Sequence, residues 1–148
     1  MATWFAYAFA GAHRISDLRV QLGQEERTDA DARFRWTENG TVYDAPVQLK
    51  ELPPETVNAA LTIERLVELV CKKYPNTRDL IVAIYLNRSG PLNQKLNVPS
   101  LVSQLWCWGF SKPNSQELFL SGTTHSGPRH FHIGVDLSKP MDQVAVWS

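Results

Sequence analysis

A run of seven consecutive apolar residues, Leu80–Leu86, places the strongest constraint on the fold of this 148-residue chain. The run is rich in β-branched residues, and polar residues that favour turns follow it at 87–90. Short apolar runs bounded by turn residues are typical of a central strand that is buried on both faces. The sequence therefore predicts a sheet with this strand in its interior.

A helix is predicted over about residues 62–74. Apolar residues recur there at helical spacing and form one stripe, namely Ile63, Leu66, Val67 and Val70. Thr62 is a suitable N-cap, and Lys72 and Lys73 suit the negative end of the helix dipole. Pro75 ends the segment, although the helix could begin earlier, at Pro54.

A second helix is predicted over about residues 98–108. Its apolar positions again follow helical spacing, at Leu101, Val102, Leu105 and Trp108, and Gly109 is a suitable C-cap. In such a helix Trp106 would point roughly 160° away from Trp108, towards a second layer or the surface.

The N-terminal segment is expected to form a strand over residues 4–10. Period-two alternation would place Phe5, Tyr7 and Phe9 on one face and Trp4 with three alanines on the other. No Lys or Arg precedes this apolar stretch, which disfavours a signal peptide. It is also shorter than the roughly twenty apolar residues that cross a bilayer.

A hairpin is predicted between residues 33–37 and 41–49. Phe34 and Trp36 alternate with charged residues, and Asn39-Gly40 tolerates the positive φ of a tight turn. Pro46 suggests that the returning strand lies at an edge or is bulged there. Leu18, Val20 and Leu22 also alternate with polar residues, which permits a short strand at 18–22. Three further strands are expected, at Glu117–Leu120, Arg129–Leu137 and Val144–Trp147.

These elements predict one α+β domain over residues 1–148. Its mixed or mostly antiparallel sheet would have about five to seven strands, packed with the two main helices. The chain shows no internal repeat, low-complexity tract or linker. Its length suffices for one hydrophobic core without a metal or disulfide.

The charge and cysteine content narrow the function classes. Fifteen basic and fifteen acidic side chains cancel, which disfavours nucleic acid and anionic membranes as partners. Cys71 lies in a helical pattern and Cys107 between two tryptophans, so both are interpreted as small buried hydrophobes. A disulfide between them is an alternative, but a reduced protein in the cytoplasm is the simpler expectation.

Three histidines near the C-terminus form the strongest candidate for a chemical site. If residues 129–137 form a strand, His130, His132 and Asp136 share one face. Alternate residues of a strand lie about 6–7 Å apart, so two imidazoles there can converge on one metal ion. His125 could join from the preceding loop. The alternative is a solvated face of an amphipathic strand that binds nothing.

The spacing of His130, His132 and Asp136 resembles the first metal-binding motif of the cupins, an all-β family. The carboxylate is Asp where cupins usually have Glu, and the leading glycine is absent from its place. Twelve residues follow Asp136, too few for the second cupin motif. The histidine pair with Ser138 and Asp142 is also similar to the JAMM metalloprotease signature, but the offsets differ. Neither family is assigned.

Signatures of nucleophilic catalysis are weak. Residues 121–126 bring serines and threonines close to His125, but the chain lacks a Gly-x-Ser-x-Gly elbow. The segment Gly122–Gly127 could cradle an anion through backbone N–H groups, but it lacks the lysine of a P-loop.

The weak catalytic signatures favour a binding role. The first hypothesis is a small non-enzymatic protein-interaction module: an adaptor, an inhibitor or immunity-type protein, or a subunit of an oligomer. Its partner would be another protein or a second copy of the chain, contacted through Trp36, Trp106 and Trp147, because tryptophans anchor interfaces. The alternative is a metal-dependent hydrolase or small-molecule binder that holds a divalent metal at the histidines. Otherwise no cofactor is expected.

Overall fold

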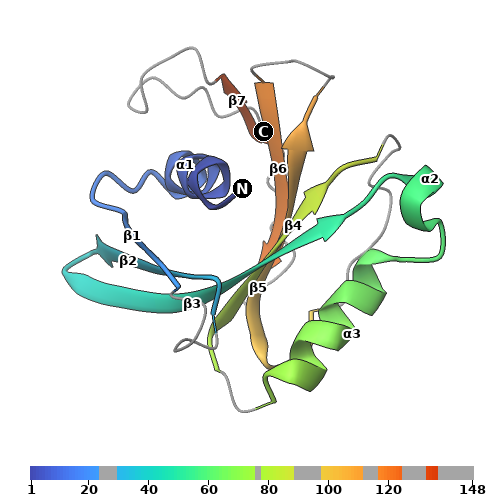
Figure 1. Cartoon of the computed structure of the whole chain (residues 1–148). Helices are drawn as coiled ribbons and strands as arrows, with labels where there is room; N and C mark the ends of the chain where they lie inside the picture. The colour runs from blue at the N-terminus through green and yellow to red at the C-terminus, as the bar shows by residue number, and fades with distance from the viewer. Residues whose placement is uncertain (24–29, 76–77, 89–97, 112–116, 125–132, 137–148) are drawn as a thin grey trace.

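A single seven-stranded sheet organises the computed structural model, and its strands lie side by side in chain order (Figure 1). The structure describes residues 1–148 except 24–29, 76–77, 89–97, 112–116, 125–132 and 137–148. The strands are β1 (Arg19–Leu22), β2 (Ala32–Glu38), β3 (Thr41–Leu52), β4 (Leu80–Leu86), β5 (Val102–Phe110), β6 (Glu117–Thr124) and β7 (Ile133–Asp136). The helices are α1 (Ala2–His13), α2 (Glu55–Asn58) and α3 (Ile63–Lys73).

The sheet is mixed. Strands β3, β4 and β5 run parallel, whereas β1–β2–β3 and β5–β6–β7 are antiparallel meanders on either side. The helix α3 covers one face, and α1 lies on the other, where the sheet curves around it (Figure 1). The predicted α+β class, with a sheet of this size and two main helices, is confirmed.

The helix predicted over residues 62–74 is confirmed as α3. The hydroxyl of Thr62 caps it by accepting the backbone N–H of Arg65 at 3.2 Å. Its stripe of Ile63, Leu66, Val67 and Val70 is buried against the residues of the sheet that face α3. The segment after Pro54 forms the separate short helix α2 rather than an extension of α3.

The strand predicted over residues 4–10 is wrong, because this segment is the helix α1. Phe5 and Phe9 stand four residues apart, which places both on one helical face, and both are fully buried. Tyr7, which the strand pattern put beside them, is only partly buried. The segment is rich in alanine, the strongest helix former, and its short apolar pattern fits either period.

The helix predicted over residues 98–108 is also wrong, because strand β5 lies there. The register between β4 and β5 shifts by one residue after Leu80, which pairs with Val102, whereas Ile81 pairs with Gln104. This irregularity places Val102 and Leu105, three residues apart, on the same face of the sheet. The irregularity in β5 therefore produced an apolar spacing of three residues, which is the spacing expected of a helix.

The remaining strand predictions agree with the structure where it describes them. The hairpin forms, and Asn39 and Gly40 both have positive φ, at 50° and 77°, as a tight turn requires. Pro46 lies where β3 pairs with β2 alone, since the pairing of β3 with β4 starts at Val47. The strand expected at 144–147 lies outside the described residues, as does the first part of the one expected at 129–137.

Aromatic side chains fill the space between α1 and the sheet. Phe5 stacks on Phe34 with ring centroids 5.6 Å apart, and Phe9 meets Trp106 edge to face at 6.0 Å. Trp106 and Trp108 stand two residues apart in β5, so both point towards α1. Across the described residues, no helix is long and apolar enough to cross a membrane.

Replacing Phe9 by alanine should lower the free energy of unfolding by about 3–5 kcal/mol, because a fully buried ring would leave a cavity. Urea unfolding followed by tryptophan fluorescence measures the loss. The control is Trp4→Ala in the same helix, where the side chain is 44% exposed and the change should be small. Equal losses in the two variants would contradict the helical packing of this segment.

Replacing Gly122 by alanine should destabilise the protein by about 1–3 kcal/mol, the usual effect of overpacking a core. A Cβ atom there would collide with ring atoms of Trp106, which lies directly over the glycine. Thermal or urea unfolding measures the effect. Ser121→Ala in the same strand is the control, since Ser121 lies on the opposite face. A Gly122→Ala variant of unchanged stability would disprove this close packing.

Candidate functional site

The proposed metal site can be located only in part. His125, His130 and His132 lie outside the described residues, and Asp136 is the last residue of β7. Within the described ranges, no group of three or more His, Cys, Asp or Glu side chains is arranged to hold a metal ion. The histidine site therefore stays a prediction.

Two of the three tryptophans predicted to contact a partner belong to the core. Trp106 is fully buried and Trp36 is 7% exposed, because both pack on the face of the sheet that α1 covers. The indole N–H of Trp106 donates to the side-chain oxygen of Gln104 at 2.8 Å. These two residues therefore cannot present a binding surface, which corrects the prediction for them. Trp147 lies outside the described residues.

The two cysteines are free thiols in the structure. Cys107 is buried beneath α3, and burial raises the pKa of its thiol to about 12, with a further contribution from the charge of Glu64. Burial also raises the pKa of Cys71. Since nucleophiles and metal ligands are thiolates, Cys107 is unsuited to either role at neutral pH.

Strand β1 forms an exposed end of the described sheet. It is the first strand of the sheet, and all four of its residues are exposed. Val20 is 40% exposed and Leu22 is 61% exposed, although both lie on the face that α1 covers elsewhere. The sequence signal was the weak alternation of Leu18, Val20 and Leu22, which predicts a strand but gives no sign that it forms an exposed edge.

The two faces of β1 differ in chemistry. Val20 lies beside Phe34 of β2, and Leu22 lies beside Ala32, so the face towards α1 is apolar. Arg19 and Gln21 occupy the other face, beside Arg35 and Arg33. The edge therefore presents an apolar row on one side and a polar, partly basic row on the other.

Three arginines share the polar face. Arg19 lies directly opposite Arg35, and like charges in this position destabilise a sheet. Arg35 also lies opposite Asp44 of β3, but the carboxylate of Asp44 binds Arg33 instead. Its Oδ1 atom accepts from Nη2 of Arg33 at 2.6 Å and from Nε at 2.8 Å.

One end of the β1–β2 pair is fixed by Asp17. Its Oδ1 atom accepts the backbone N–H of Thr37 at 3.2 Å. Hydrogen bonds from the backbone and side chain of Thr37 lower the pKa of Asp17 below its usual value of 3.8, and the charge of Arg19 lowers it further. This carboxylate therefore links the residues before β1 to the end of β2.

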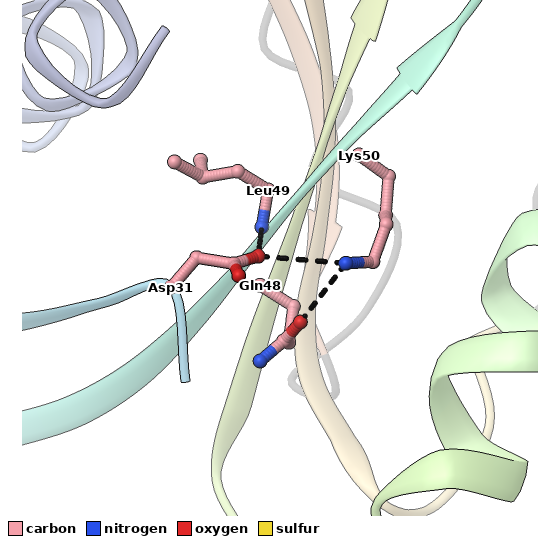
Figure 2. Close-up of polar contacts among 4 residues, drawn as sticks. All are labelled: Asp31, Gln48, Leu49 and Lys50. Carbon is pink, nitrogen blue, oxygen red and sulfur yellow. Dashed lines mark hydrogen bonds and ion pairs between the residues drawn. The ribbon is translucent and has the colours of Figure 1, made fainter. Parts of the chain in front are cut away.

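The other end is fixed by Asp31, at the start of β2. Figure 2 shows its carboxylate between the backbone N–H of Leu49 and the ammonium group of Lys50. Oδ2 of Asp31 accepts from Leu49 at 2.7 Å and lies 3.5 Å from Nζ of Lys50. Lys50 also donates to Oε1 of the buried Gln48 at 3.1 Å. The backbone of Asp31 bridges the strands as well, since its carbonyl accepts from Gly23.

These contacts hold β1 in a defined position against β2. Among the described residues, no strand pairs with that edge. An open strand edge presents backbone N–H and C=O groups that can pair with another chain. The chemistry available at this surface is therefore backbone hydrogen bonding, flanked by apolar contact on one side and positive charge on the other.

Comparisons with known proteins identify no relative. No family model matches the chain, and neither a curated protein nor a solved structure is detectably similar to it.

Replacing Asp17 by asparagine should reduce stability near neutral pH and remove part of its acid dependence. A carboxylate whose pKa is lowered in the folded state stabilises the protein above its unfolded value of 3.8, and the effect is lost as the pH falls through the folded pKa. The difference between wild type and variant should therefore shrink from about pH 6 to about pH 2.5. Urea unfolding at both pH values measures it.

The neighbouring Ser16→Ala is the control for this experiment, since it removes an exposed neutral side chain and should keep the wild-type pH profile. A stability difference between wild type and Asp17→Asn that stayed constant over the whole pH range would contradict the role of the ionised carboxylate.

Proposed function

We propose that this protein is a non-enzymatic protein-interaction module that binds an extended segment of its partner along the outer edge of β1. One observation carries the proposal: β1 forms an end of the described sheet, and every one of its side chains is exposed. Strand addition to an open edge is a common mode of peptide recognition, in which backbone hydrogen bonds give affinity and alternate side chains give specificity.

The edge has some, but not all, of the features that protect natural sheets from unwanted pairing: β1 is short and carries Arg19. Edge strands are protected by short length, by charged side chains, by proline, by a bulge or by a covering element. β1 contains no proline, and its register with β2 is continuous over all four residues. Its short length does limit the number of backbone hydrogen bonds. Binding would therefore depend on side-chain contacts as well, and the exposed Val20 and Leu22 are placed to provide them.

The hydrogen bonds that hold β1 against β2 also support a binding role. The carboxylate of Asp17 accepts the backbone N–H of Thr37 at one end of the β1–β2 pair, and the carbonyl of Asp31 accepts the N–H of Gly23 at the other. A strand that is already ordered loses little conformational entropy when a partner pairs with it, and such preorganisation favours affinity. The binding surface is thus the strand edge rather than the tryptophans that the sequence suggested.

Short random peptides selected for binding to the full-length chain test this proposal. The selected peptides should slow amide hydrogen exchange in β1. Methylation of alternate peptide nitrogens should abolish their binding, because it removes the donors that strand pairing needs. Protection that falls elsewhere on the protein, or N-methylated peptides that bind equally well, would overturn the proposal.

Two matched substitutions sharpen the test. Val20→Ser should weaken the selected peptides by roughly tenfold, because it removes apolar contact beside the bound strand. Val57→Ser makes the same change at a valine of α2 that is 73% exposed, and it should leave binding unchanged. Equal effects of both substitutions would argue against binding at β1.

A further inference from the structure

We infer that the segment bound at β1 carries acidic side chains on one face and apolar side chains on the other. This inference rests on the proposed function and specifies the chemistry of the partner. Successive side chains of an added strand point to opposite faces of the sheet. One set would therefore lie beside Val20 and Leu22, and the other beside Arg19 and Gln21. The partner must therefore alternate between two kinds of residue.

The apolar half of the inference follows from Val20 and Leu22. Both point to the same side of the sheet as the core beneath α1, yet they stay exposed outside that core. Apolar side chains of an added strand would lie directly beside them and bury them. That burial extends the existing apolar face by one strand, and removing apolar surface from water is favourable.

The acidic half follows from the excess of positive charge on the opposite face. Arg19, Arg33 and Arg35 lie there, and Asp44 pairs with Arg33. The ion pairs found among the described residues include neither Arg19 nor Arg35. Asp17 is close enough to Arg19 for the two charges to interact, so one positive charge remains in excess. A carboxylate on an added strand opposite Arg19 would relieve its repulsion with Arg35.

A second copy of the chain is a poorer occupant of this edge. β1 has the sequence Arg-Val-Gln-Leu and contains no acidic residue. Two copies of β1 paired antiparallel would therefore bring no carboxylate opposite Arg19, and they would add a second set of arginines to the same face. Nucleic acid would leave Val20 and Leu22 without an apolar partner. An acidic, extended segment of another protein satisfies both faces.

Two synthetic peptides test the inference with the full-length chain. One alternates Glu with Val, and the other alternates Lys with Val. Fluorescence anisotropy should show about tenfold tighter binding of the Glu peptide at low salt. The preference should shrink as the salt concentration rises, because exposed charges are screened.

Charge reversal on the protein gives the matched variants. Arg19→Glu should remove the preference for the Glu peptide or reverse it, since Arg19 is the charge on β1 that lies beside an added strand. Arg65→Glu makes the same change on α3, where the arginine is exposed and pairs only with Glu68 among the described ion pairs, and it should leave the preference intact. Loss of the preference in both variants would point to net charge rather than to this face, and would overturn the inference.

The possible failures are distinguishable. If both peptides bind equally and protect the amides of β1, strand addition stands and the acidic partner is wrong. If neither peptide binds, the proposed function and the inference both fail. Sedimentation velocity tests whether the chain associates with itself. Self-association that Val20→Ser abolishes would show that a second copy occupies the edge, and would overturn the inference of an acidic partner.

Discussion

The packing of α1 against the aromatic face of the sheet is the interaction on which the rest of the structure depends. Phe5 and Phe9 are fully buried; both rings contact Phe34 of β2, Phe5 also contacts Trp108 and Phe9 contacts Trp106 of β5. Burial of large rings is among the strongest apolar contributions to stability. Because this one helix gathers side chains from β2 to β6, the sheet curves around it and both meanders are held to the parallel centre.

The position of α1 also determines which surface stays open. Its core includes residues of β2 on the same face as Val20 and Leu22, but it stops before β1. The first strand consequently keeps its hydrogen bonds to β2 while its side chains remain in water. The exposure of Val20 and Leu22 is therefore a direct result of how far α1 extends across the sheet.

Polar contacts hold β1, β2 and β3 in register at this end of the sheet. Asp17 and Asp31 accept backbone N–H groups from β2 and β3, and the pair between Arg33 and Asp44 links the same two strands on the exposed face. Exposed ion pairs contribute little to stability individually. We therefore assign these contacts a role in positioning the strands rather than in stabilising the fold. They fix the register of β1–β2–β3 and leave Arg19 and Arg35 facing each other without an ion pair among the described residues.

Local sequence signals were sufficient to predict the elements whose signals agree with their surroundings in the fold. Leu80–Leu86 is apolar throughout and became a buried strand, Asn39-Gly40 made the hairpin turn, and the capped stripe after Thr62 made α3. In two segments the local spacing fits both a helix and a strand, and contacts with the rest of the fold select between the two. Phe5 and Phe9 belong to a helix because one face of the sheet offers an aromatic layer to cover, and β5 is a strand because β4 and β6 pair with both of its edges. The exposure of Val20 and Leu22 likewise follows from the tertiary structure, since it depends on how far α1 extends across the sheet, which the local sequence does not show.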